Sequence, residues 1–414
     1  MKFSRIRGTE DKLDLTIKNF ISDKVRETLK NYNFTEIETP ILEQEQLICR
    51  SLGECTDVVT KEMFRISAAG DEKMCLRPEA TASTVRAYLE NNVEEKPWNN
   101  FSIGPMFRHE RPQKGRWRQF DQINIESINS ISISHDAQFL AMLERLFSET
   151  FKLADYSLSI NFLGTLEERK NYRHKLIEFL QKNKDKICET CLNRTSKNPL
   201  RVFDCKSSEC HKIYESAPLL INNLGTESQK QWENLKENLQ ILSVSFVEDP
   251  KLVRGLDYYE GLVFEFASPF LGAQSAFAGG GRYELAKEFG AKEAVPSIGV
   301  AVGLGRLSLL IEREKEKLVF PQKPALNVIL PMSEEQHTIA LLLAEHVRNS
   351  GKCVQILFDQ KKIQKMMRRA NKMGAKNVLI LGDEEQKSGK VTVKDMTTGS
   401  EQTVMQDEAV KFLS

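Results

Sequence analysis

Residues 104–118 read GPMFRHERPQKGRWR, and this stretch decides the fold that we predict. Five of the eleven residues from Arg108 to Arg118 are Arg or Lys, and Glu110 is the only acidic one. Apolar residues precede the block, and an alternating pattern with period two follows it, so we expect a strand, a long basic loop and a second strand. One face of the second strand would carry Phe120, Gln122, Asn124 and Glu126.

The basic loop suits phosphate groups, because the planar guanidinium of Arg forms strong charge-assisted bonds with phosphate oxygens. A polar strand face that ends at Glu126 suits a small, charged substrate beside those phosphates. Most charge runs are merely solvated loops, and the spacing alone leaves both interpretations open.

The segment Phe107–Pro112 resembles motif 2 of class II aminoacyl-tRNA synthetases. With residues 113–116 and 118–120 added, the string is similar to the histidyl-tRNA synthetases in particular. The resemblance implies an α+β catalytic domain with an antiparallel sheet, a helical insertion and a C-terminal α/β domain. We therefore expect a catalytic domain over 1–320, an insertion over 165–245 that touches tRNA, and an anticodon-binding domain over 325–414, after a charged, Pro-containing linker at 312–324.

The bulk composition is that of a globular protein with more than one domain. The chain has 414 residues, 40% of them hydrophobic and 28% charged, and a net charge of +1, so a polyanion would bind at local patches. No signal peptide begins at Met1, and no apolar run is long enough to cross a bilayer. The eight Cys include isolated ones, which fits a reducing cytosol better than a disulfide framework, so we expect a cytoplasmic protein with no membrane partner.

Residues 31–48 predict a turn and a strand, Phe34–Glu43, that ends near Pro40. The residues alone predict that this segment supports the fold and takes no part in catalysis. Its resemblance to motif 1 of the class implies a dimer interface, and so a homodimer.

Glu79 and Thr81 follow Pro78 at the expected start of a helix that runs through Asn92. A carboxylate and a hydroxyl at this place either support the helix N-terminus or bind an ammonium group. The resemblance implies the second role, in contact with the α-amino group of histidine.

The resemblance also implies roles along the predicted hairpin. Arg108 would contact the α-phosphate of ATP and the substrate carboxylate, Gln122 would lie at the amino-acid site, and Glu126 would accept a bond from the substrate imidazole. The loop residues that would meet ATP or the tRNA acceptor end are Arg111, Gln113, Arg116 and Arg118. The chain departs from the family at Trp117, usually Tyr, and at Asp121, commonly His.

Residues 254–261 contain Arg254, Tyr258 and Tyr259 among glycines. The two aromatics are either half-buried structural residues or part of a recognition loop. The string matches a signature particular to histidyl-tRNA synthetases. That match implies that Arg254 stabilises charge at the α-phosphate and that both tyrosines belong to the histidine site, with Tyr259 bonded to the imidazole opposite Glu126.

Two glycine-rich strings follow, at 278–283 and 296–307. Glycines allow close approach of the backbone to a ligand, but they also mark tight turns. The second string resembles motif 3, whose Arg306 would pack on adenine and reach the ATP phosphates. The family usually has Glu directly before this Arg, whereas this chain has Gly305.

Two further features bear on metals and nucleic acid. Cys188, Cys191, Cys205 and Cys210, with His211, either bind structural zinc or are reduced structural thiols, and the second interpretation is favoured, so no metal ligand is predicted. A helix at 361–372 would bury Ile363, Met366, Met367 and Ala370. Its outer face would carry Lys361, Lys365, Arg368, Arg369 and Lys372. This face is either a plain soluble surface or an electrostatic footprint for nucleic acid, and the resemblance favours the latter.

The function implied by the resemblance is a histidine–tRNA ligase. It would form histidyl-adenylate from L-histidine and ATP with Mg²⁺, and then transfer the histidyl group to the 3′ end of tRNA(His). The alternatives are a histidine-sensing regulatory subunit of ATP phosphoribosyltransferase, which typically lacks the anticodon domain, and a class II synthetase for another amino acid.

Overall fold

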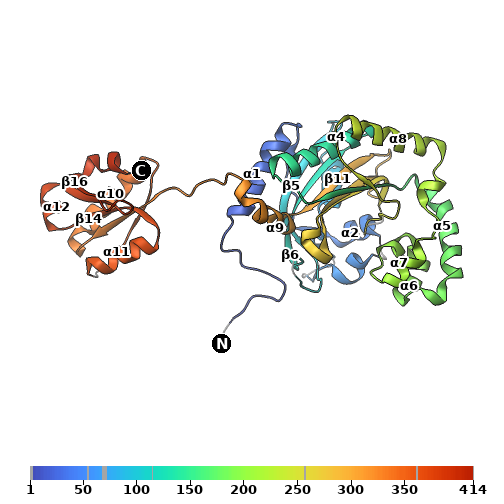
Figure 1. Ribbon diagram of the computed structural model, residues 1–414, viewed down its shortest axis with the longest axis horizontal. Helices are drawn as coiled ribbons and strands as arrows, with labels where there is room; N and C mark the ends of the chain where they lie inside the picture. The colour runs from blue at the N-terminus through green and yellow to red at the C-terminus, as the bar shows by residue number, and fades with distance from the viewer. Residues whose placement is uncertain are drawn as a thin grey trace. The chain divides into compact units, whose positions relative to one another are not determined.

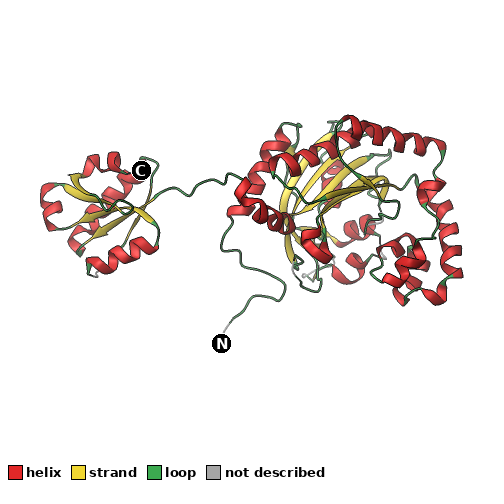
Figure 2. Cartoon of the chain, in the orientation of Figure 1, coloured by secondary structure: helices red, strands yellow, loops and turns green. Residues whose placement is uncertain are grey.

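The computed structural model describes residues 3–53, 56–67, 72–113, 115–255, 258–359 and 362–413 (Figures 1 and 2). The chain divides into two compact units, Met1–Phe320 and Pro321–Ser414. Each unit has its own sheet and its own buried core. No helix in the described ranges combines the length and the apolar character that crossing a membrane would require.

The first unit is built on an eight-stranded sheet. Its order is β1 (Thr35–Glu36), β5 (Trp98–Phe107), β6 (Gln119–Ile128), β11 (Ser297–Gly303), β10 (Ala276–Tyr283), β9 (Tyr259–Ala267), β7 (Ser157–Phe162) and β8 (Val247–Glu248). The six inner strands are antiparallel, and each edge strand runs parallel to its neighbour. The predicted antiparallel sheet is confirmed for the six inner strands.

The predicted hairpin is β5 and β6, with Phe107 opposite Gln119 and Asn100 opposite Glu126. Because side chains alternate along β6, Ile123 and Ile125 enter the hydrophobic core while the polar residues between them lie on the other face. The alternating pattern therefore predicted both the strand and the face that carries polar groups.

Aromatic side chains join the sheet to the helices on its apolar face. Helix α4 (Ile133–Arg145) continues into a π-helical turn, η2 (Leu146–Thr150), whose Phe147 lies 4.9 Å from Phe266 and 5.0 Å from Phe277 between ring centroids. Each such buried ring contributes roughly 1.5–3 kcal/mol. Helices α1 (Thr16–Lys30) and α9 (Leu304–Glu314) contribute to the same core (Figure 1).

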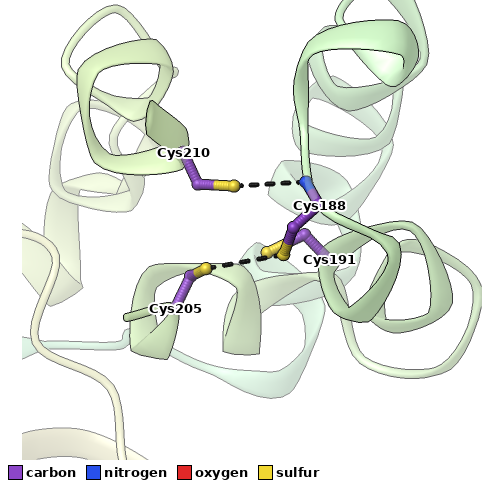
Figure 3. Close-up of side chains that lie close together, drawn as sticks. All are labelled: Cys188, Cys191, Cys205 and Cys210. Atoms are coloured by element: carbon purple, nitrogen blue, oxygen red, sulfur yellow. Dashed lines mark hydrogen bonds between the residues drawn. The ribbon is translucent and has the colours of Figure 1, made fainter. Parts of the chain in front are cut away.

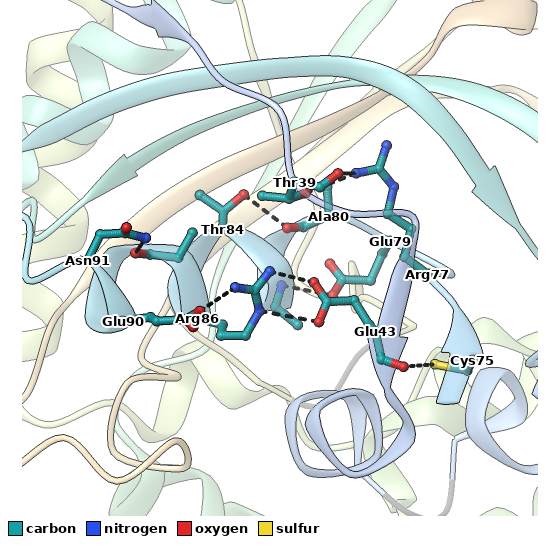
Figure 4. A network of polar contacts seen from close by, with 12 residues as sticks. Thr39, Glu43, Cys75, Arg77, Glu79, Ala80, Thr84, Arg86, Glu90 and Asn91 are labelled. Atoms are coloured by element: carbon teal, nitrogen blue, oxygen red, sulfur yellow. Dashed lines mark hydrogen bonds and ion pairs between the residues drawn. The ribbon is translucent and has the colours of Figure 1, made fainter. Parts of the chain in front are cut away.

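The predicted continuous strand Phe34–Glu43 is wrong. The chain forms β1 and then, after Pro40, β2 (Leu42–Gln44), which pairs with β4 (Met74–Leu76) and β3 (Arg65–Ile66) in a separate small sheet. Arg77 explains the break, because its Nη1 donates to the carbonyl oxygen and Oγ1 of Thr39 at 2.8 and 2.9 Å (Figure 4). The π-helical turn η1 (Val58–Glu62) and helices α2 (Glu45–Leu52) and α3 (Thr81–Glu90) surround this sheet, and Arg86 of α3 holds Glu43 of β2 through two bonds.

The insertion is helical, as predicted. Its helices are α5 (Leu166–Lys182), α6 (Glu189–Lys197), α7 (Ser208–Tyr214) and α8 (Thr226–Ile241), joined by 3₁₀ turns that include η4 (Pro199–Asp204). A capping box of Thr165 and Glu168 starts α5. Helix α8 packs against α4 of the eight-stranded unit.

The second unit is an α/β domain, as predicted. Its sheet has the order β13 (Cys353–Ile356), β12 (Leu326–Pro331), β14 (Ala375–Leu381), β15 (Lys390–Asp395) and β16 (Glu401–Met405), with helices α10 (His337–Asn349), α11 (Ile363–Lys372) and α12 (Asp383–Ser388). No signal in the sequence indicated β16 or α12, and the chain closes with a 3₁₀ segment, η9 (Gln406–Phe412). Ile363 was expected inside but is 37% exposed, because it stands at the first turn of α11, outside the packed centre.

A buried ion pair joins β10 to α4. The Nε and Nη2 of Arg282 donate to the two oxygens of Asp136 at 2.9 and 2.6 Å, and Nη1 donates to the carbonyl oxygen of Ser130 at 2.6 Å. Asp136 is fully buried. Arg282, part of a glycine-rich string in the sequence, therefore has a structural role.

We predict that Arg282→Met lowers the free energy of unfolding by about 3–5 kcal/mol, because it leaves the Asp136 carboxylate buried without its partner. Urea unfolding measures the change. Lys315→Met, which removes the exposed pair with Glu312, is the control and should change the free energy of unfolding far less. Equal effects of the two substitutions would contradict the assignment.

Candidate active site

A cavity of about 1240 Å³ opens on the polar face of the sheet. Several of the residues singled out in the sequence line it together: Glu79, Thr81, Arg108, Arg116, Gln122, Arg254, Tyr258, Tyr259 and Arg306. They come from α3 and the residues just before it, the β5–β6 hairpin, the segment that leads into β9 with its first residue, and α9. Glu126, Arg111, Gln113 and Arg118 are not among the described residues of the lining.

Glu126 lies directly behind the cavity wall and is 1% exposed. Its Oε1 accepts a hydrogen bond from Thr81 Oγ1 at 2.7 Å, and its Oε2 accepts one from Tyr283 OH at 2.7 Å. Burial raises the pKa of this carboxyl to about 8, although both hydrogen bonds act to lower it. A Cβ atom at Gly299 would overlap the carboxylate, so the glycine on β11 makes room for it. The sequence gave Tyr283 and Gly299 no role.

Glu79 caps α3. Its two carboxylate oxygens accept bonds from the backbone N–H groups of Thr81 and Ala82 at 2.7 and 2.9 Å. The Glu79 side chain is only 4% exposed, and this burial raises its pKa. The structural interpretation of Glu79 is thus present in the molecule, and its contact with an ammonium group stays a prediction.

Arg254 faces the cavity from the segment before β9. Its Nη1 donates to Glu265 Oε2 at 2.6 Å, and a Cβ at Gly279 would overlap its guanidinium. Tyr258 lies against both Tyr259 and Tyr283, with ring centroids 4.5 and 5.6 Å apart. Gly279 therefore leaves space for the Arg254 side chain, as Gly299 does for Glu126. Glu265 is a further partner of Arg254 that the sequence did not reveal.

Guanidinium groups, among them those of Arg108, Arg116 and Arg306, give the cavity a positive wall. The Nε of Arg108 donates to the carbonyl oxygen of Pro78 at 2.9 Å, and its guanidinium lies 5.5 Å from the ring centroid of Phe120. Arg306 donates to the carbonyl oxygen of Ala276 at 2.6 Å. Burial, and next the charge of Arg116, lower the pKa of Arg306, so an anion that enters here would relieve repulsion between cations.

The N-terminal segment also borders the cavity, and the sequence had assigned it no role. Residues 10–15 belong to the lining, and the carbonyl oxygen of Gly8 accepts a bond from the N–H of Arg118 at 2.7 Å. Lys12 and Lys18 each donate to Asp121 Oδ2 at 2.9 Å. These bonds outweigh burial and lower the pKa of Asp121. Asp121, where the family commonly has His, and the lysines early in the chain could have indicated this contact, but we did not connect them from the sequence.

The residues predicted to contact tRNA differ in their exposure to solvent. Arg111 and Gln113 are exposed, while Arg118 is half-buried under the N-terminal segment. On α11 of the second unit the exposed basic residues are Lys365, Arg368, Arg369 and Lys372, and Arg369 forms an ion pair with Asp359. Lys361 lies outside the described residues.

Four cysteines of the insertion come together. The Sγ atoms of Cys188, Cys191, Cys205 and Cys210 all lie within 4.8 Å of one another, a set that can hold a metal ion (Figure 3). The sequence presented them as two separate groups and favoured structural thiols. That interpretation did not foresee that all four thiols converge.

The comparisons with known proteins agree along the chain. The family model described as "Histidyl-tRNA synthetase" matches residues 16–307, and the one described as "Anticodon binding domain" matches residues 327–414. The histidine–tRNA ligase of Halothermothrix orenii is 40% identical over 409 residues and 96% of each chain. That of Maridesulfovibrio salexigens is 39% identical over 418 residues, 99% of this chain and 100% of its own.

Solved structures show the same architecture. The crystal structure of apo histidyl-tRNA synthetase from S. aureus matches with a TM-score of 0.81 and 31% identity over the whole of both chains. An ATP phosphoribosyltransferase regulatory subunit/histidyl-tRNA synthetase from Bacillus halodurans matches with a TM-score of 0.63 and 20% identity, over 89% of this chain and 97% of its own. The second likeness is one of fold alone.

The raised pKa of Glu126 predicts a pH effect on stability. The folded chain keeps this proton between about pH 4.5 and pH 8, where the unfolded chain has lost it, so stability falls as pH rises through this window. We therefore expect Glu126→Gln to gain stability relative to the wild type between about pH 5.5 and about pH 8.5. Urea unfolding of both proteins at the two pH values measures this gain. A stability difference between variant and wild type that is the same at both pH values would contradict the prediction.

Gly305 is predicted to tolerate a side chain. Apart from its chain neighbours and the backbone of its own helix, no described atom lies within 4 Å of an ideal Cβ at this position in the first turn of α9. Gly305→Glu should therefore raise the free energy of unfolding by about 1 kcal/mol, since it removes a helical glycine and places an acid near the helix N-terminus. Gly299→Ala is the contrasting variant and should be strongly destabilising. Thermal unfolding compares them, and a destabilised Gly305→Glu would refute the prediction.

Proposed function

The chain belongs to the histidyl-tRNA synthetase family, and from this we propose that it ligates L-histidine to tRNA(His) with ATP. The enzyme is a histidine–tRNA ligase. The observation that carries the detailed proposal is the cavity that joins two kinds of group: a buried carboxylate, Glu126, behind Thr81 and Tyr283, and a wall of guanidinium groups.

The acidic and aromatic end of the cavity is proposed to select histidine. Glu79 and Thr81 would take the α-amino group, while Glu126, Tyr258 and Tyr259 would surround the imidazole and Gln122 would border the amino acid. Both oxygens of Glu126 already hold one hydrogen bond, and each has a second lone pair for a substrate N–H. A buried polar pair rejects side chains that cannot complete its hydrogen bonds far better than an apolar pocket does.

The guanidinium wall is proposed to carry the activation step. One oxygen of the histidine carboxylate attacks the α-phosphorus of ATP, the bond to the β-phosphate oxygen breaks, and pyrophosphate leaves. Positioning and charge stabilisation are what such a phosphoryl centre requires. Arg108 and Arg254 would hold the carboxylate and the α-phosphate, while Arg116 and Arg306 would hold the rest of the nucleotide.

Mg²⁺ is proposed to accompany ATP. Glu62 and Glu110 both line the cavity, and the pKa of Glu62 is raised by burial and then by the charge of Glu110. Glu110 also pairs with Arg116, and carboxylates in the same cavity offer the oxygen ligands that Mg²⁺ prefers. The ion would neutralise negative charge on the phosphates of the nucleotide.

The second step would transfer the histidyl group to tRNA. The 3′ ribose hydroxyl attacks the acyl carbon, and AMP leaves with the bonding electrons. Arg111, Gln113 and Arg118 would meet the acceptor end, and the basic face of α11 (Lys365, Arg368, Arg369 and Lys372, with Lys361 beside it in the sequence) would meet the anticodon region. Contacts of this kind lose affinity steeply as salt rises.

A homodimer through the motif 1 segment is part of the proposal. Ile41 and Leu42, which follow Pro40, are 40% and 49% exposed in the single chain. Exposed apolar residues beside the proposed interface are consistent with burial against a second copy. Sedimentation at micromolar concentration tests this, and a monomer at every concentration would remove the dimer from the proposal.

Charging of tRNA(His) with labelled histidine tests the ligase itself. The proposal expects charging that depends on ATP and on both domains of the chain. Binding of histidine without any charging would instead favour the histidine-sensing regulatory subunit. Retention of Arg108, Arg254 and the second α/β unit argues against that alternative.

We predict that Arg254→Ala lowers histidine-dependent exchange of pyrophosphate into ATP by about 10²–10³-fold, because it removes a fixed positive charge at the reacting phosphate. The circular dichroism spectrum should not change. Arg348→Ala, on α10 of the second unit, is the matched control and should exchange normally. Near-normal exchange in Arg254→Ala would exclude Arg254 from the activation step.

A further inference from the structure

The four cysteines of the insertion are arranged as one site. Cys188 and Cys191 stand at the start of α6, Cys205 directly follows η4, and Cys210 lies in α7. Their side chains point toward a common centre from three separate segments (Figure 3). Cys191, Cys205 and Cys210 are buried, and Cys188 is partly so. The site lies outside the cavity proposed for histidine and ATP.

The spacing of the sulfur atoms fits a single tetrahedral ion. A Zn–S bond of about 2.3 Å places the corners of a tetrahedral Zn–S₄ centre roughly 3.8 Å apart. The Sγ atoms of Cys188 and Cys205 are 3.7 Å apart, and all four lie within 4.8 Å. A disulfide requires about 2.05 Å, and Cys188, Cys191, Cys205 and Cys210 form none. An iron–sulfur cluster would sit between the thiolates and hold them farther apart than this.

Backbone N–H groups already point at the sulfurs. The N–H of Cys188 donates to Cys210 Sγ at 3.3 Å, and the N–H of Ser207 donates to Cys205 Sγ at 3.4 Å. Donors of this kind stabilise a thiolate and orient it, as outer-shell groups do around bound metals. The site therefore has four sulfur ligands and backbone N–H donors that favour the thiolate form of two of them.

The surrounding helices need such a cross-link. Helix α6 has 9 residues and α7 has 7, and helices this short are marginal without tertiary support. Between them lies the short 3₁₀ segment η4. Four ligands from these three segments would close the loop and fix their relative placement.

The same segment reaches the catalytic cavity. Arg201 and Asp204 of η4 line that cavity, and Asp204 directly precedes Cys205. Arg194 of α6 donates to the carbonyl oxygen of Arg201 at 2.8 Å, and a guanidinium nitrogen of Arg201 lies 3.6 Å from an ideal Cβ at Gly255, next to Arg254. Whatever fixes η4 therefore also fixes two charged side chains beside the Arg254 segment.

We propose that Cys188, Cys191, Cys205 and Cys210 bind one structural Zn²⁺ ion as four thiolates, and that this ion holds Arg201 and Asp204 of η4 at the wall of the catalytic cavity. Each thiol that ligates the ion releases its proton to solvent, and the ion exchanges its waters for sulfur. No electron is transferred. The site is a positioning device and takes no part in the chemistry.

Metal analysis of the full chain, purified without chelators or a metal-affinity tag, tests the binding. We expect about one zinc ion per chain in the wild type. Cys205→Ser should lose most of the zinc, whereas Cys353→Ser, in β13 of the second unit, should keep it. Chain that stays free of zinc after incubation with Zn²⁺, that holds iron instead, or that carries a native disulfide among the four cysteines would overturn the proposal.

Replacing the ion by Co²⁺ in the wild type tests the site without a variant, so the result does not depend on whether Cys205→Ser folds. Tetrahedral thiolate coordination gives intense sulfur-to-cobalt absorption, and its absence would refute the four-thiolate site. A zinc-selective chelator should slow pyrophosphate exchange in the wild type, and added Zn²⁺ should restore it while Mg²⁺ is present throughout. Exchange that is unaffected by complete zinc loss would refute the link to the catalytic cavity.

Discussion

The structure depends on keeping one carboxylate, Glu126, inside the catalytic unit. A buried carboxyl group of this kind is tolerated only when partners satisfy its oxygens. Thr81 from α3 and Tyr283 from β10 donate to its two oxygens, and Gly299 on β11 leaves the space that it fills. The helix and the strands around the cavity are therefore held together by the same group that we propose as the acceptor of a substrate N–H.

Opposite charges are separated along the cavity by the fold. The acidic group comes from the middle of the sheet, while Arg108, Arg254 and Arg306 come from the hairpin, the segment before β9 and the start of α9. Arg254 is held by Glu265 and accommodated by Gly279. We therefore propose that one end of the cavity receives an imidazole and an ammonium group and the other receives phosphates, as an adenylate-forming site requires.

Local patterns in the sequence carried much of the fold and much of the site. Period-two alternation placed Gln122 and Glu126 on one face of β6, because that pattern is set by neighbouring residues. Contacts between distant segments left no such signal: the bond from Arg118 to Gly8, the capture of Thr39 by Arg77 that divides the expected strand, and the convergence of the four cysteines. The glycine strings were visible, but only the folded chain shows which side chain each glycine accommodates.

The central claim is that Glu126, with the hydroxyls around it, makes the cavity a histidine site. Exchange of pyrophosphate into ATP, with each of the twenty amino acids in turn and no tRNA, measures this most directly. The account predicts exchange with histidine alone. Exchange with another amino acid, or none with histidine in well-folded, zinc-replete protein, would contradict it.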